Sequence, residues 1–197
     1  MAIAEIELKF PVADALAFSR QMHELDFQLI TPPTFESNTL YDTSARTLRE
    51  QKQLLRLRQY GEVWTLTHKA QPPAESDSAR YKVRLETETQ LANGPAMAEI
   101  FAQLGYLPVF RYEKFRTEWA DPVSGHHLVL DETPIGIWAE LEGSPEWIDA
   151  TLTRLGVDAA ICITESYGRL FLAWKERTGS PVEHLTFGAI QLQPQPV

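Results

Sequence analysis

Alternation of apolar and polar residues is the dominant pattern of this sequence. Successive side chains of a β-strand point to opposite faces, so such a segment is typical of a strand with one buried face. The pattern predicts strands over residues 3–10, 34–41, 53–60, 63–69, 80–89, 107–119, 127–132 and 135–142. The turn at Gly61 and Glu62 is short, which predicts that the strands on either side of it form an antiparallel hairpin.

Helical spacing and capping residues predict fewer helices than strands. They indicate helices over residues 11–25, 96–104, 145–155 and 164–177, and a short helix or turn at 44–51. Ser144 is expected to cap the third of these helices, because its hydroxyl can accept a hydrogen bond from the first turn. Many strands with short connections predict an α+β fold, in which an antiparallel sheet or barrel has helices packed outside.

The length and composition are those of a single domain. The chain has 197 residues, 44% of them hydrophobic, which is enough for a sizeable core. We expect this domain to span residues 1–178. The segment 179–197 contains three prolines and is expected to be a tail that is either irregular or laid over the surface.

The charge and cysteine content exclude several classes of protein. A net charge of −9 argues against general binding to nucleic acid or to an anionic membrane. The single cysteine, Cys162, excludes an internal disulfide and fits a reducing compartment. The sequence has no signal peptide and no apolar run of membrane-spanning length, so we expect a cytoplasmic protein. The oligomeric state stays open.

The first strand carries the first candidate chemistry. Its alternation places Glu5, Glu7 and Lys9 on one face. Two adjacent carboxylates are stable together when a cation or proton lies between them, and a divalent metal is the obvious candidate. A solvated charged face is the alternative, and for one strand alone it is the commoner case.

Charges recur at every second position in the other predicted strands. They include Arg56, Arg58, Lys69, Lys82, Arg84, Glu86, Glu88, Lys114, Arg116, Asp131, Glu140 and Glu142. A pattern repeated over so many strands predicts a barrel whose charged faces point inward. The acidic residues lie mainly in the first and last strands and the basic residues in the middle ones. Barrel closure would therefore gather acids on one wall and cations on the other.

A lumen with six or more cations should require a highly charged anion. Arginine suits phosphate oxygens, because its planar guanidinium donates two parallel hydrogen bonds. The acidic wall would repel that anion unless Mg²⁺ or Mn²⁺ bridged the two. A linear polyphosphate group with bound metal satisfies both walls.

The ordered set of motifs resembles the CYTH superfamily, the triphosphate tunnel metalloenzymes. The resemblance covers residues 3–167 and includes the Glu-x-Glu-x-Lys signature at residues 5–9, Tyr-Asp-Thr at 41–43, Leu-Arg-Leu-Arg at 55–58 and Glu-Leu-Glu-Gly at 140–143. It implies an eight-stranded antiparallel tunnel that binds triphosphate with a divalent metal. The implied metal ligands are Glu5, Glu7, Glu140 and Glu142, with Asp131 or Glu88. The implied phosphate-binding residues are Lys9, Arg56, Arg58, Lys69, Arg84, Lys114 and Arg116.

These inferences predict an Mg²⁺- or Mn²⁺-dependent triphosphatase acting on inorganic triphosphate or on a small organic one, such as thiamine triphosphate. We expect Glu5, Glu7 and Lys9 to act in catalysis. A class IV adenylate cyclase is the alternative enzyme, but the His-Phe pair that cyclases carry before the signature is absent here. A polyphosphate-binding module without turnover is the third possibility. Lys82, at a strand edge, is expected to be solvated, and Trp138 either to stack on an organic group or to fill the core.

Overall fold

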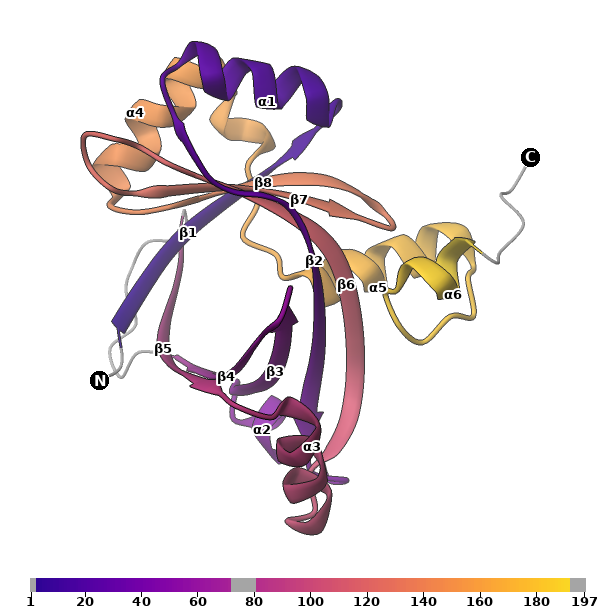
Figure 1. Cartoon of the computed structure of the whole chain (residues 1–197). Coiled ribbons are helices and arrows are strands. Elements are labelled where there is room, and N and C mark those ends of the chain that lie inside the picture. The colour runs from indigo at the N-terminus through magenta and orange to yellow at the C-terminus, as the bar shows by residue number, and fades with distance from the viewer. Residues whose placement is uncertain (1–2, 72–80, 192–197) are drawn as a thin grey trace.

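Eight antiparallel strands form a closed barrel in the computed structural model, which describes residues 3–71 and 81–191 (Figure 1). The strands are β1 (Ile3–Val12), β2 (Gln28–Asp42), β3 (Leu54–Tyr60), β4 (Val63–Ala70), β5 (Lys82–Leu91), β6 (Leu107–Ala120), β7 (His127–Thr133) and β8 (Gly136–Glu142). Their order around the barrel is β1-β5-β4-β3-β2-β6-β7-β8. The predicted α+β barrel is therefore confirmed.

The first strand pairs with two strands that are distant in sequence. On one side β1 pairs with β8, with Glu7 opposite Glu142 and Lys9 opposite Glu140. On its other side β1 pairs with β5. The expected closeness of the first and last strands is thus confirmed, whereas the pairing of β1 with β5 was not foreseen.

Two element boundaries differ from those predicted. The first helix, α1 (Ala15–Glu24), begins after Asp14, whose carboxylate accepts hydrogen bonds from two backbone amides of the first turn. Residues 11–12 instead continue β1, because they pair with β8. Strand β2 begins at Gln28, well before residue 34, and its pairing with β6 shifts register around Thr31. The two prolines that follow Thr31 hide this part of the strand, since proline cannot donate to a ladder.

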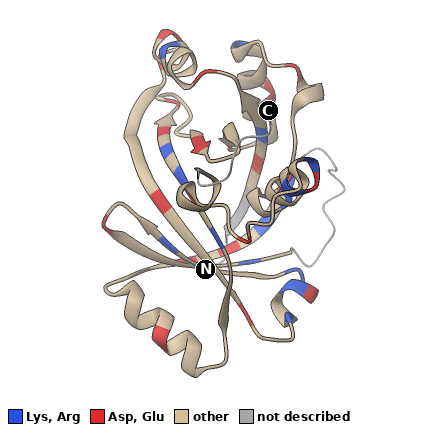
Figure 2. Ribbon diagram, turned by 90° about the vertical axis from the view of Figure 1, so that its right-hand side faces the viewer, with Lys and Arg blue, Asp and Glu red and all other residues tan. Residues whose placement is uncertain are grey.

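The main hydrophobic core lies on the outer face of the barrel. Helices α1 and α4 (Pro145–Leu155) cover β1, β7 and β8 there, as Figure 1 shows. Leu8, Leu128 and Leu141 are buried beneath these helices. Their neighbours in sequence point to the opposite face. The barrel is apolar outside and charged inside, and Figure 2 shows charged residues along its strands.

The predicted cap of α4 is confirmed, and α5 begins later than predicted. Ser144 accepts a hydrogen bond from the first turn of α4, as predicted. The helix predicted from residue 164 is α5 (Tyr167–Thr178), which begins after its own cap, Ser166. Two short helical segments, α2 (Thr47–Glu50) and η1 (Ala159–Ile161), precede β3 and α5 in the chain.

A smaller core lies under α3 (Gly94–Gln103), which packs against the outer side of β3 and β4. Gly94 fits closely there, because a Cβ at this position would lie 2.0 Å from a ring carbon of Trp64. A side chain at residue 94 would therefore displace either the helix or the tryptophan.

The segment after Gly179 is more ordered than expected. Leu185 is fully buried and forms a β-bridge with Tyr112 of β6. Helix α6 (Phe187–Gln191) follows, so this stretch is not irregular but is laid over the barrel, the second of the two expected arrangements. Leu185 belongs to the apolar cluster that includes Phe171 of α5, and burial of this leucine explains why the segment packs down. None of the helices in the described residues is long and apolar enough to span a membrane.

Candidate functional site

The barrel encloses a charged cavity of about 960 Å³. All the predicted site residues whose side chains are described line it, with the exception of Asp131: Glu7, Lys9, Arg56, Arg58, Lys69, Arg84, Glu88, Lys114, Arg116, Glu140 and Glu142. Strand parity thus placed these side chains on the correct face. Glu5 pairs with Arg84 through its backbone, but the Glu5 side chain lies outside the described part of the structure.

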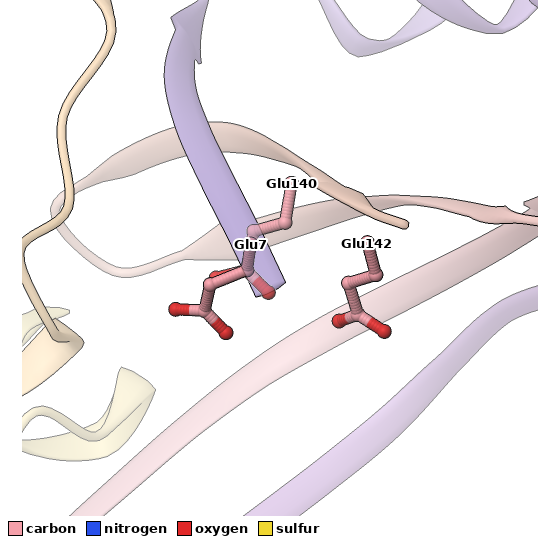
Figure 3. Close-up of side chains that lie close together, drawn as sticks. All are labelled: Glu7, Glu140 and Glu142. Atoms are coloured by element: carbon pink, nitrogen blue, oxygen red, sulfur yellow. The ribbon is translucent and has the colours of Figure 1, made fainter. Parts of the chain in front are cut away.

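Three carboxylates converge on one wall of the cavity (Figure 3). Glu7 of β1 and Glu140 and Glu142 of β8, here called the acidic cluster, each offer an oxygen within 4.8 Å of the other two. The β1–β8 register causes this convergence, because it places Glu7 directly opposite Glu142. Carboxylate oxygens at this spacing are the ligand type that Mg²⁺ and Mn²⁺ prefer. The donor set therefore fits a hard divalent cation.

Two lysines contact the acidic cluster. Lys9 Nζ pairs with Glu140 Oε1, and Lys82 Nζ pairs with Glu7 Oε1. Burial would lower the pKa of Lys9, but Glu140 and Glu7 outweigh it and raise that pKa above its usual value. Burial would likewise raise the pKa of Glu140, but Lys9 and Arg116 hold it well below its usual value. Lys9 and Glu140 are therefore both charged at neutral pH.

The expectation that Lys82 is solvated is wrong. Its side chain is 20% exposed, lines the cavity and pairs with Glu7. The prediction failed because Lys82 was placed at a free strand edge. In the structure β5 pairs with β1, and Lys82 lies directly opposite Glu7.

Asp131 lies in a second buried group, formed with Lys114, Arg116 and Tyr167 and here called the Asp131 network. Its carboxylate accepts hydrogen bonds from Lys114 Nζ at 2.8 Å, from Arg116 Nε and Nη2 at 2.7 Å, and from the Tyr167 hydroxyl at 2.7 Å. Asp131 is fully buried and lies outside the acidic cluster. Arg116 Nη2 also donates a hydrogen bond to Glu140 Oε2 at 2.8 Å, so this guanidinium lies between Asp131 and the acidic cluster.

Tyr167 links this network to the acidic cluster. The Lys9 ammonium lies 4.4 Å from the centre of the Tyr167 ring, and the Lys114 ammonium lies 5.0 Å from it. A cation over an aromatic face is attracted by the ring quadrupole. Burial, together with Asp131, raises the pKa of Tyr167 well above its usual value, so its hydroxyl stays protonated. The sequence analysis assigned no role to Tyr167.

Glu36 of β2 is a buried carboxylate that the sequence analysis missed. It is fully buried, lies 3.3 Å from Lys114 Nζ and accepts a hydrogen bond from Asn38 Nδ2 at 2.8 Å. Burial would raise its pKa, but Lys114, Arg116 and further arginines lower it to about 2. Glu36 lies on the inward-facing side of the predicted strand 34–41, and this position was the signal that could have identified it.

The cations of β3 and β4 also have carboxylate partners. Lys69 Nζ lies 2.8 Å from Glu86, and Arg58 Nη2 lies 3.1 Å from Glu88. Arg56 Nη2 lies within 4.0 Å of both carboxylates. Glu88 thus lies among arginines, apart from the acidic cluster. These pairs correct the argument that the cations need an added anion to be tolerated, because interior carboxylates already compensate much of their charge.

Trp138 belongs to the core. It packs with the apolar cluster that includes Phe171 and Leu185, and it does not line the cavity. Of the two roles that the sequence left open, the structure supports core packing.

Comparison with solved structures shows the same fold in several proteins. A proposed adenylate cyclase from Vibrio parahaemolyticus is 20% identical, with a TM-score of 0.74 over 87% of this chain and 99% of the other. A protein from Pyrococcus horikoshii OT3 is 23% identical, with a TM-score of 0.69 over 86% and 99% of the two chains. A proposed adenylyl cyclase from Hippeastrum, described as having a dominant triphosphatase activity, is 20% identical, with a TM-score of 0.61 over 88% and 96%.

Among curated proteins, none matches the sequence. The family comparison is decisive, because the model of the CYTH domain matches residues 4–143. This range contains the whole acidic cluster and, apart from Ile3 at the start of β1, all eight strands of the barrel. The chain therefore belongs to the CYTH domain family.

Proposed function

We propose that this protein is a metal-dependent triphosphatase that cleaves the terminal phosphoanhydride of inorganic triphosphate or of a small organic triphosphate. The observation that carries the proposal is the acidic cluster, whose three carboxylates share one charged cavity with a set of lysines and arginines. Membership of the CYTH family and the triphosphatase activity described for the Hippeastrum protein agree with it.

In this proposal Glu7, Glu140 and Glu142 hold Mg²⁺ or Mn²⁺, together with Glu5 of the family signature. A bound divalent cation neutralises phosphate charge and activates water. Glu88 and Asp131 have a different role, which is to hold arginine and lysine side chains in position. This assignment follows from their contacts with cations and from their absence from the group of three converging carboxylates.

The cationic side chains bind the phosphate oxygens in this proposal. They are Lys9, Arg56, Arg58, Lys69, Arg84, Lys114 and Arg116, which all line the cavity. Phosphoryl transfer depends mainly on positioning and charge stabilisation, so fixed cations around the transferred group supply most of what the reaction needs. The interior carboxylates hold these cations at fixed positions before the substrate arrives.

The direct test is phosphate release from inorganic triphosphate, thiamine triphosphate and ATP, with Mg²⁺, with Mn²⁺ and with a chelator. We expect metal-dependent release from at least one of these substrates, and the preferred substrate would identify the physiological class. Cyclic AMP formation from ATP without phosphate release would instead identify a cyclase. Tight triphosphate binding without any product would identify a binding module.

Substitution of Glu7 tests the assignment of the acidic cluster. We expect Glu7→Gln to lower metal-dependent turnover at least about a hundredfold, because the amide keeps the shape but loses the ligand charge. The far-ultraviolet circular dichroism spectrum should not change. Turnover close to wild type in a folded Glu7→Gln variant would contradict this metal site.

A further inference from the structure

The proposed reaction assigns no role to the ion pair between Lys82 and Glu7. Lys82 and Glu7 lie directly opposite each other on β5 and β1. Both side chains are largely buried in the cavity wall, with 20% and 10% of their surfaces exposed. The pair therefore lies inside the candidate site, where solvent screens it less than a surface pair.

A divalent cation and Lys82 need the same carboxylate. The Lys82 ammonium contacts Glu7 Oε1, and Glu7 is one of the three residues of the acidic cluster. Two cations on one carboxylate at contact distance repel each other. Metal binding to Glu7 therefore requires that the Lys82 ammonium leave this oxygen.

The Lys82 ammonium also has other possible acceptors within the cavity. It lines the same cavity as the phosphate-binding cations, and the flexible stem of a lysine allows its ammonium to reach new acceptors without movement of the strand. A triphosphate in the cavity would supply such acceptors. The ammonium could then exchange a carboxylate partner for a phosphate partner within one charged site.

We propose that Lys82 is a positioning residue that neutralises Glu7 in the metal-free protein and competes with the divalent cation for this carboxylate. The inference rests on the proposed function and deepens it. The acidic cluster binds metal weakly while Lys82 holds Glu7, and a triphosphate strengthens metal binding by drawing Lys82 away. By thermodynamic reciprocity, metal strengthens triphosphate binding by the same factor.

The test measures Mn²⁺ affinity without any triphosphate, by electron paramagnetic resonance of free Mn²⁺ added to chelator-stripped protein. We expect Lys82→Met to bind Mn²⁺ about tenfold more tightly than wild type, since a competing ion pair is removed. The matched control is Lys52→Met, which removes the same charge from the lining of the same cavity. Its affinity should stay within about twofold of wild type, because Lys52 does not hold Glu7.

A charge-retaining variant adds a second criterion. Lys82→Arg should bind Mn²⁺ nearly as weakly as wild type, because a guanidinium also pairs with a carboxylate. If Lys82→Met melts far below wild type, Lys82→Gln replaces it, since the amide can still donate a hydrogen bond to Glu7. A structural role alone would change the melting temperature of these variants without tightening their Mn²⁺ binding.

Three results would overturn the inference: unchanged or weaker Mn²⁺ binding in the folded Lys82 variant, equal tightening in the Lys52 control, or no Mn²⁺ binding by wild type and variant alike. These results are separate from the fate of the proposed function, which phosphate release by the wild type tests. If the wild type is a triphosphatase but Lys82→Met has unaltered Mn²⁺ affinity, the proposed function stands and the inference about Lys82 is refuted.

Discussion

The acidic cluster and the Asp131 network both place carboxylates inside the barrel, but the contacts of these carboxylates differ. In the acidic cluster three carboxylates face one another. Each has cationic neighbours: Lys82 contacts Glu7, Lys9 and Arg116 contact Glu140, and Arg116 Nη1 lies 4.0 Å from Glu142. In the Asp131 network a single carboxylate accepts four hydrogen bonds from three side chains and is fully buried. The first group has like charges close together, whereas the second is fully satisfied.

This difference separates two uses of buried charge. A carboxylate with every acceptor site used contributes to a fixed scaffold, and removal of one partner leaves the others unpaired. Carboxylates that crowd one another keep capacity for a cation from solution. The partners of the carboxylates distinguish the two groups: in the acidic cluster carboxylates face other carboxylates, whereas Asp131 faces only hydrogen-bond donors.

The largest loss of stability is expected when the carboxylate of the Asp131 network is removed. We expect Asp131→Asn to lower the free energy of unfolding by about 3–5 kcal/mol, because Lys114 and Arg116 would remain buried without their shared partner. Urea denaturation at pH 7 measures the change. A loss below about 1 kcal/mol would show that the network is not a scaffold.

The pH dependence of stability tests the same scaffold at Glu36. Its pKa in the folded protein is about 2, below the ordinary value of 4.5. Its stabilising contribution is therefore complete above about pH 4.5 and is lost as the pH falls towards 2. The shift corresponds to roughly 3 kcal/mol. We expect Glu36→Gln to be less stable than wild type at pH 7 and to approach it near pH 2, as measured by denaturation across this range. A difference that does not depend on pH would contradict the assignment.

Substitutions of Tyr167 test both groups, because Tyr167 donates a hydrogen bond to Asp131 and its ring contacts Lys9, the partner of Glu140. Tyr167→Phe removes the hydrogen bond to Asp131 and keeps the ring beneath Lys9 and Lys114. We expect a loss of about 1 kcal/mol in the free energy of unfolding. Tyr167→Leu also removes both cation–aromatic contacts, so this variant should be less stable than Tyr167→Phe. It should also raise the KM for triphosphate more than Tyr167→Phe does. Equal KM values for the two variants would show that the ring does not position these lysines.

The smallest effect on stability is expected in the acidic cluster. Glu142 is one of its carboxylates, and 29% of its side chain is exposed. Glu142→Gln should change the free energy of unfolding by less than about 1 kcal/mol, since its contact with Arg116 is long, at 4.0 Å, and partly open to solvent. Mn²⁺ affinity should nevertheless fall. A large loss of stability with unchanged Mn²⁺ affinity would reverse the roles assigned to the two groups.

Much of the fold was accessible from the sequence, because strand alternation is a local property. Parity placed Glu7, Lys9 and Glu140 on the inner face, and all three line the cavity. The closeness of the first and last strands followed from barrel closure. Proline obscured the start of β2, and Leu185 gave no signal that the segment after residue 179 would pack against β6.

Pairing partners were not accessible, because register depends on the whole barrel. Lys82 was misplaced for this reason, since its contact with Glu7 requires that β5 lie beside β1. Glu36 was missed because nothing in its own strand indicates that Lys114 lies opposite it on β6. Parity gives the face of a strand on which a side chain lies, but it does not give the neighbour across the strand.

Because β1 pairs with β8, the barrel cannot close until the last strand has been synthesised. Lys9 and Glu140 are 131 positions apart in the chain. At about 5–20 residues per second, on the order of ten seconds of translation separate the two residues. During that interval β1 leaves the ribosome with its apolar face uncovered and without its final neighbour. Contacts this distant in sequence also make spontaneous closure slow. The nascent chain therefore passes through a stage in which a chaperone that shields β1 would compete directly with aggregation.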